Sequence, residues 1–501
     1  MKELRLITCS LSIVILLMLQ TAGAVAQENT VDYLYSPSLD QEKQLLIDRI
    51  NTHARNSEYD YALTLSNQLL QAVEPLSSTD TTTYGKILVN HGIIHSATGD
   101  YELGLSIISR GLEFMEERVS PFSRTLINAI MAKALTEMAM EQHEISEDTF
   151  RWAQNITHRQ GGVYAREQIP IIEFLTASHL RQGQALDADR EQLFSLKVHE
   201  QVHGPDSLEL LPVLNRMGSY FATRGSTIPV FVDNEFKLQR DDLFRQSIEL
   251  YLRAIDIIEK NYGTNDLRLV EPLRGMASAR MLQITSRKYA EAALERALEI
   301  VDSNPDSDIT DRVQAMVDLG DLYTIISDSR AGPTYLKAWQ LLQESSETRS
   351  LAIALFGTPV RLFPRENKVL YLDRQPDNTE PGDPLFVTIE YSVTTDGKVN
   401  RVGVIDKNVP NEQVRLMRQR VRATSFRPRI QDGELVPTEG LVIYQPYQVA
   451  RIYSDADGDE SGTEVSGTEE SGTEELDDDL DQDTLEATGA STSAVAEDKV
   501  S

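Results

Sequence analysis

The chain contains a single cysteine among its 501 residues, Cys9, and that residue lies close to the amino terminus. Disulfide bonds and thiol chemistry therefore cannot organise the rest of the chain. Basic residues are also scarce: 48 lysines and arginines face 78 acidic residues, for a formal net charge of −30. A field of this sign repels phosphates, so nucleic acid is not an expected partner. No apolar run of about 18 residues follows the amino terminus, so no later membrane span is expected.

The remaining composition is that of an ordinary globular protein, with 41% hydrophobic and 25% charged residues. The length favours about two or three domains. No nucleophile elbow, phosphate-binding loop or dinucleotide-binding fingerprint occurs in a suitable context. Composition and motifs together give no support for an enzyme of these classes, and no cofactor is expected.

Residues 1–26 have the pattern of a secretory signal peptide. Two basic side chains precede a short apolar run at 11–19, and the small residues 24–26 precede Gln27. This order is typical of a segment that signal peptidase removes. We therefore expect an exported protein in the periplasm of a Gram-negative bacterium, with no stable membrane insertion after cleavage. The alternative is a segment that stays uncleaved as an anchor.

Residues 27–350 show helical periodicity and internal repetition. In the segment 88–112, small and large residues alternate at offsets that let two antiparallel helices pack closely. These residues are Leu88, Gly92, His95, Gly99, Tyr101, Gly104, Ile108 and Gly111. The same signals recur at Gly218, Tyr251, Gly320, Tyr323, Tyr335 and Ala338. The pattern predicts stacked helix pairs, with most of the tyrosines as core residues.

A second self-similarity supports the array. Residues 204–218 resemble residues 263–277, and a proline occupies the same place in both segments. This spacing of about 60 residues is longer than the usual repeat of about 34 residues, so insertions are expected. The clearest candidate is the stretch 226–243, which contains a proline and a short β-branched run.

These residues resemble the tetratricopeptide-repeat family over most of the stretch 38–350. The resemblance implies a helical solenoid whose groove binds peptides or other proteins.

A change to alternating hydrophobicity marks residues 383–453. Alternate residues of 385–393 are apolar, and Asp396-Gly397 follows as a hairpin turn. The stretch 399–404 reads as the return strand, 410–424 as a helix, and 435–449 as the last strands. We therefore expect a small α+β domain with β-β-α-β order.

Three segments of this domain resemble the C-terminal domain of TonB-type proteins: 387–406, 425–437 and 440–449. The resemblance implies capture of an outer-membrane receptor or another envelope protein by strand addition at a sheet edge. The edge predicted for this contact is formed by Leu441, Val442, Ile443, Tyr444 and Gln445. The alternative is that this strand is paired internally. A TonB transducer also keeps an inner-membrane anchor and a proline-rich spacer, which this sequence replaces with a cleavable segment and a helical array.

The predicted helix of this domain is basic. Arg415, Arg418 and Arg422 are candidates for contact with an acidic partner, although a solvated helix face explains them equally well. The preceding residues 351–382 contain prolines and little periodicity, so we expect a linker there.

Residues 454–501 form an acidic tail. Seventeen acidic residues and one lysine give this segment a charge of −16, and three Ser-Gly-Thr-Glu copies precede a run of aspartates. Such a composition cannot bury enough apolar area to offset the entropy of ordering, so disorder is expected.

One catalytic signature is present. His199, Glu200 and His203 match the HExxH spacing, which places two imidazoles on one helix face for zinc and a carboxylate as base. Against this, Gly204 and a proline follow directly, and the internal repeat places Ile258 and Tyr262 at the positions of the two histidines. A third ligand such as Glu235 would have to come from the insertion.

The sequence thus predicts a mainly α protein: a tetratricopeptide-like solenoid, a small α+β domain and an acidic tail. Its expected function is that of a non-enzymatic interaction scaffold. Two alternatives stay open. One is an accessory or transducer component of TonB-dependent transport, and the other is a zinc metallopeptidase with its site at 199–203.

Overall fold

The computed structural model describes residues 30–228, 234–283, 287–344, 346–363, 370–372, 374–376, 379–380 and 382–449. The predicted signal peptide and acidic tail lie outside the described residues. None of the helices in the described part is long and apolar enough to cross a membrane.

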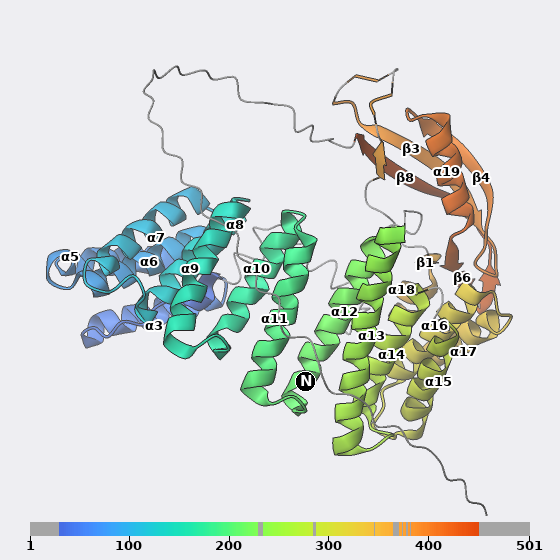
Figure 1. The fold of residues 1–501 in the computed structure, drawn as a ribbon, viewed down its shortest axis with the longest axis horizontal. Helices are drawn as coiled ribbons and strands as arrows, with labels where there is room; N and C mark the ends of the chain where they lie inside the picture. The colour runs from blue at the N-terminus through green and yellow to red at the C-terminus, as the bar shows by residue number, and fades with distance from the viewer. Residues whose placement is uncertain are drawn as a thin grey trace, which may run out of the picture. The chain divides into compact units, whose positions relative to one another are not determined.

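Antiparallel helix pairs follow one another through the first part of the chain (Figure 1). The pairs are α3 (Gln41–Arg55) with α4 (Tyr59–Val73), α6 (Thr81–Ala97) with α7 (Tyr101–Glu116), α8 (Ile127–Ala139) with α9 (His143–Gly161), α10 (Ile169–Arg181) with α11 (Ala185–His203), α12 (Leu211–Thr227) with α13 (Asn234–Tyr262), α14 (Val270–Leu282) with α15 (Lys288–Ser303), and α16 (Ile309–Ile326) with α17 (Ala331–Gln343). Short helices α5 (Leu76–Thr79) and α18 (Arg349–Phe356) lie between and after them. The expected solenoid of helix pairs is confirmed.

The repeat unit is longer than that of a common tetratricopeptide array. The first helices α8, α10 and α12 begin at Ile127, Ile169 and Leu211, so their starts are evenly spaced. A single 3₁₀ turn precedes each of these helices and α14: η2 (Arg124–Leu126), η3 (Arg166–Gln168), η4 (Leu208–Leu210) and η5 (Leu267–Leu269). The step from α12 to α14 is longer still, because α13 has 29 residues where α9 and α11 have 19. Part of the expected insertion at 226–243 therefore forms the first turns of α13.

The small residues of the repeat allow close helix contacts. A Cβ atom on Gly92 of α6 would lie 2.8 Å from the carbonyl oxygen of Gly104 of α7, and one on Gly104 would lie 2.9 Å from that of Gly92. Only glycine fits both positions at this separation. Tyr251 fills the equivalent gap between Gly218 and Gly275. The packing role predicted for the repeat tyrosines is confirmed for Tyr251, Tyr323 and Tyr335, which are buried, whereas Tyr101 is only partly buried.

The C-terminal sheet has the strand order β2-β8-β3-β4. Its strands are β2 (Leu370–Leu372), β3 (Leu385–Val393), β4 (Val399–Lys407) and β8 (Thr438–Val449), and β3 is antiparallel to both of its neighbours. The helix α19 (Asn411–Arg422) packs on the face formed by alternate residues of β3, with Val414, Met417 and Val421 buried as predicted. The predicted turn is also present, with Gly397 at a φ of 76°.

The stretch expected to be a linker contains a helix end and two short strands. Residues 351–382 include most of α18, which packs on α17, and β1 (Val360–Phe363), which pairs with β5 (Ser425–Arg427). The hairpin of β6 (Arg429–Gln431) and β7 (Glu434–Val436) packs on α18 and α17. Ile430 accordingly belongs to the same hydrophobic cluster as Phe356 of α18. The short strands β5, β6 and β7 therefore pack on the last helices of the array.

Candidate functional site

An open groove of about 950 Å³ lies between α15 and α17, with α16 beneath it. Its floor is apolar, because Met316 and Leu319 of α16 are buried there and Leu298 of α15 is partly buried. The helices α15 and α17 are the second members of two successive pairs. The groove therefore arises from the stacking of one pair on the next.

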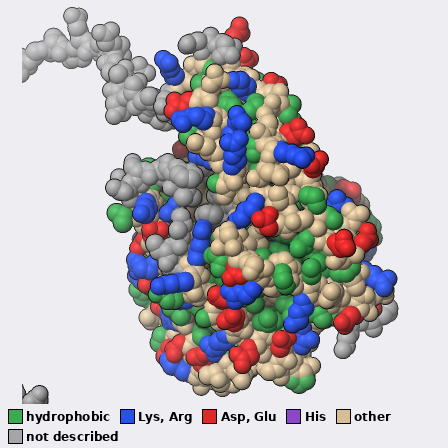
Figure 2. Space-filling view, turned by 90° about the vertical axis from the view of Figure 1, so that its right-hand side faces the viewer, with side chains coloured by type: hydrophobic (Ala, Val, Ile, Leu, Met, Phe, Trp, Pro, Cys, Tyr) green, Lys and Arg blue, Asp and Glu red, His purple; other side chains and the backbone are tan. Residues whose placement is uncertain are grey.

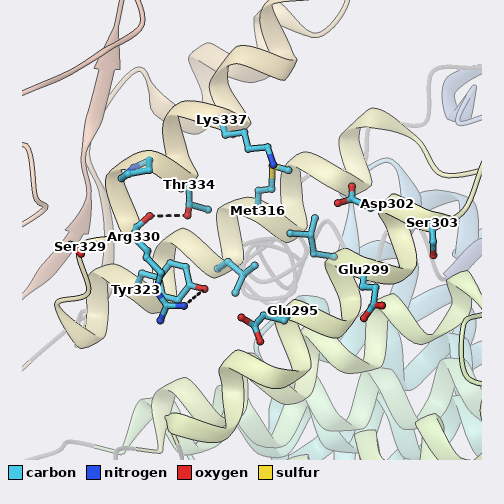
Figure 3. A pocket seen from close by; sticks show the side chains of 13 residues that line it. Glu295, Glu299, Asp302, Ser303, Met316, Tyr323, Ser329, Arg330, Thr334 and Lys337 are labelled. Carbon is cyan, nitrogen blue, oxygen red and sulfur yellow. Dashed lines mark hydrogen bonds between the residues drawn. The ribbon is translucent and has the colours of Figure 1, made fainter.

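The two walls of the groove carry opposite charges. Glu295 and Glu299 of α15 are exposed on one wall, four residues apart and hence on one helix face. Lys337 of α17 is exposed on the other wall (Figure 3). Within the described part of the chain, none of these three side chains has an ion-pair partner. They are available to a molecule that enters the groove.

Arg330 lines one end of the groove (Figure 3). The guanidinium of Arg330 pairs with Asp328 at 2.7 Å and with Glu291 at 2.6 Å. It also donates to the hydroxyl of Tyr323 at 3.1 Å and lies over that ring at 4.1 Å from its centroid. The side-chain hydrogen bonds to the two carboxylates raise the pKa of Arg330 further. These partners hold Arg330 as part of the wall.

The two histidines of the HExxH match, His199 and His203, both lie on α11. Among the described residues, no group of three or more histidine, cysteine or acidic side chains is arranged to hold a metal ion. The rings of His199 and His203 stack with their centroids 6.0 Å apart, and Glu200 forms an ion pair with Arg253 of α13. Glu200 is therefore not free to act as a base. The side chain of Glu235 lies outside the described residues.

His199 is a packing residue in the array. It is only 9% exposed, and neither of its ring nitrogens has a hydrogen-bond partner among the described residues. Burial, together with the nearby charges of Arg216 and His203, lowers its pKa to about 4. This agrees with the internal repeat, in which Ile258 occupies the corresponding position and is fully buried.

The predicted edge segment lies in β8 and, among the described residues, is paired with another strand on one side only. Residues 441–445 of β8 pair with 387–391 of β3, and β2 pairs with β8 on its other side at Tyr447–Val449. The outer strand of this order is β4, on which Val404 and Ile405 are 37% and 56% exposed. Of the predicted contact residues, Val442 and Tyr444 are exposed, Leu441 is partly buried, and Ile443 and Gln445 are buried. Their role in binding stays a prediction.

The arginines of α19 differ in their solvent exposure and in their contacts. Arg415 and Arg422 are exposed, and Arg415 lies 3.9 Å from Glu412 on its own helix. Arg418 is partly buried and donates to the carbonyl of Val402 at 3.4 Å. Figure 2 shows basic side chains interspersed with acidic and apolar ones on the face that it draws. A strongly basic surface is therefore not a feature of this face.

A buried ion pair joins the C-terminal strands to the array. Arg427 of β5 is 7% exposed, and its guanidinium donates two hydrogen bonds to Asp321 of α16, at 2.9 and 2.7 Å. It also donates to the carbonyl of Leu355 at 3.2 Å, and the hydroxyl of Tyr335 donates to Asp321 at 2.8 Å. Burial disfavours the cation, but the charge of Asp321 outweighs it and raises the pKa of Arg427. The last helices and β5 are thus held together next to the groove.

No protein-family model matches the chain, and no curated protein matches it. Solved structures of helical-repeat proteins do match. A putative kinesin light chain of Podosopora anserina with nearly identical TPR-like repeats is 10% identical, with a TM-score of 0.33 over 44% of this chain and 96% of that one. BtubC (BKLC) from P. vanneervenii is 13% identical, with a TM-score of 0.26 over 58% and 91%. The apo form of the quorum sensor NprR from B. thuringiensis is 12% identical, with a TM-score of 0.30 over 64% and 89%.

These scores are low, so the TPR-like description rests on the helix pairs of this chain. The resemblance of residues 383–453 to the TonB C-terminal domain finds no support among the comparisons.

The groove is not predicted by any pattern in the sequence. Its acidic wall is visible in the sequence as Glu291, Glu295 and Glu299, which recur at every fourth position. Such a row is also typical of a solvated helix face, and the opposing Lys337 comes from the next helix but one. Only the packing of α15 against α16 and α17 brings them to one site.

Proposed function

We propose that this protein is a non-enzymatic scaffold that binds polypeptide segments, and that the groove between α15 and α17 is a binding site. The observation that carries the proposal is the open groove itself, with an apolar floor and unpaired charges of both signs on its walls. Grooves of this kind suit an amphipathic chain segment, because apolar side chains gain from burial while polar ones stay at the rim.

The described part of the chain offers no comparable arrangement for catalysis. The one motif with catalytic spacing has its carboxylate paired with Arg253 and its first imidazole buried. The groove contains a lysine and acids, and these acids are exposed to solvent. Binding is therefore the function that the geometry favours.

A photo-crosslinking experiment tests this function. A benzophenone amino acid placed at Lys337 is expected to form adducts with another polypeptide in cells that produce the full-length protein. The matched control is the same amino acid at Glu113, which is exposed on α7. Equal adducts from both positions, or none from position 337, would contradict the proposal.

Strand addition at the C-terminal sheet is a second candidate function. Among the described residues, β4 is paired on one side only, and an open edge offers backbone groups to another strand. Its exposed Val404 and Ile405 supply apolar contacts. If a partner adds here, Ile405→Lys should abolish its binding, because a charge on an edge strand disfavours pairing. Crosslinking from position 337 should be unchanged in that variant.

The location of the protein belongs to the same proposal. We place it in the periplasm on the pattern of residues 1–26, and an accessory role in TonB-dependent outer-membrane transport would also require export. Amino-terminal sequencing of the exported protein separates an exported scaffold from an anchored transducer. A mature terminus at Gln27 excludes the anchored transducer, whereas an intact terminus shows that the first segment is retained as an anchor.

A further inference from the structure

We infer that the groove selects polypeptide segments in which an apolar side chain is flanked by a lysine or an arginine. This inference rests on the proposed function, because it specifies the ligand of the same groove. It is based on the unpaired charges of Glu295, Glu299 and Lys337 and on the apolar surface between them.

The two acids of the α15 wall repel each other. Glu295 and Glu299 lie four residues apart on one helix face, and like charges at this spacing destabilise a helix. Both side chains are exposed and, within the described residues, neither is paired with a cation. A cation brought by a ligand would relieve this repulsion, so the wall favours basic side chains.

The arginines around this wall are already engaged. Arg296 pairs with Glu259 at 2.5 Å and donates to the carbonyl of Thr264. Arg312 pairs with Asp302 at 2.6 Å. Arg330, at one end of the groove, pairs with Asp328 and Glu291 and donates to Tyr323. The neighbouring arginines therefore pair with other carboxylates, and the carboxylates of Glu295 and Glu299 can pair with a cation of a ligand.

The floor and the opposite wall fix the rest of the ligand. Leu298 is partly buried and Pro333 is exposed, so these two side chains offer an apolar surface above the buried Met316 and Leu319. This surface suits an apolar side chain and the aliphatic stem of a lysine or arginine. Lys337 repels a cation on the α17 side, so the basic residue is restricted to the α15 side (Figure 3). Lys337 instead favours a carboxylate on the far flank of the same segment.

Selection from a random peptide library displayed on phage provides the test, with the purified full-length protein as the target. Peptides enriched by the wild type are expected to carry a lysine or arginine beside an apolar residue. Their affinity should fall about tenfold for Glu295→Gln with Glu299→Gln, since two exposed ion pairs are lost. Higher ionic strength should weaken binding to the wild type more than binding to this variant.

Two further variants make the test specific. Glu113→Gln with Glu117→Gln removes two carboxylates of the same spacing from the end of α7 and should leave the affinity unchanged. Glu295→Lys with Glu299→Lys reverses the wall and should shift the enriched peptides from basic to acidic flanks.

The outcomes separate the ligand chemistry from the function. One outcome would overturn the inference and leave the proposed function intact. In that outcome, the enriched peptides crosslink to position 337 but carry no basic residue, and they bind the variant with Glu295→Gln and Glu299→Gln as tightly as the wild type. Failure to enrich any peptide that crosslinks at position 337 would overturn both.

Discussion

The ion pair between Arg427 and Asp321 provides the sharpest test of how the C-terminal strands are held. In Arg427→Met, a side chain of similar length remains, but Asp321 keeps its charge in a site where its side chain is only 13% exposed. Tyr335 still donates to that carboxylate, while two hydrogen bonds from the guanidinium and one to Leu355 are lost.

The expected loss follows from this burial. Removing one partner of a buried pair leaves an uncompensated charge and typically costs about 3–5 kcal/mol. Replacing both partners by apolar residues, in Asp321→Leu with Arg427→Met, removes the stranded charge together with its desolvation cost. The free energy of unfolding of the double variant should lie within about 1–2 kcal/mol of the wild type. The single variant should therefore be less stable than the double variant.

Trp339 of α17 is a suitable reporter. A Cβ atom on Gly433, in the turn of the β6–β7 hairpin, would lie 3.2 Å from its ring, so its fluorescence responds to this contact. Urea unfolding followed in a Trp152→Phe background, which removes the other tryptophan, gives the stability of this region. A loss below about 1 kcal/mol in Arg427→Met, or a double variant no more stable than the single one, would refute the reasoning.

Three other predictions concern the helical array. Gly92→Ala should lower the free energy of unfolding by about 1–3 kcal/mol, because the added Cβ meets the α7 backbone. The control is Gly403→Ala, whose Cβ would have no heavy atom within 4 Å. Equal losses of stability in the two variants would contradict the close approach of α6 and α7. Burial and the nearby charge of His95 lower the pKa of His91 from 6.5 to about 4. As the pH falls from about 6.5 to 4, the imidazole therefore takes up a proton in the unfolded chain before it does so in the folded protein. The free energy of unfolding should decrease over this pH range. His91→Gln should flatten the dependence measured by denaturation at pH 7 and 4.5, and an unchanged slope would exclude this cause. His199→Phe should raise the melting temperature, because two unpartnered nitrogens leave the core; stoichiometric zinc in the wild type that this variant loses would instead favour the metallopeptidase.

The local parts of the fold could be predicted from the sequence. The alternation of 385–393 identified β3 with its buried face, and the Asp396-Gly397 turn fixed the hairpin, because both signals are carried by adjacent residues. The glycines of α6 and α7 likewise predicted a close helix pair. Each of these features depends on contacts between segments that are near each other in sequence.

Long-range contacts explain what the sequence analysis missed. Residues 360–363 looked like a linker because β1 gains its partner only from β5, which follows β2, β3, β4 and α19 in the chain. No local pattern in the sequence indicates a partner for Arg427, because its partner Asp321 lies 106 residues away. The groove has the same origin, because charges that are solvated on an isolated helix become the walls of a site when three helices stack.

Hydrogen–deuterium exchange of the full-length protein, with and without a peptide selected by it, tests the central claim most directly. Binding in the groove predicts slower exchange in the exposed turns of α15 and α17 that carry Glu295, Glu299 and Lys337, and unchanged exchange in α6 and α7. Protection confined to β4 or to the first helix pairs, with none in α15 and α17, would contradict the account.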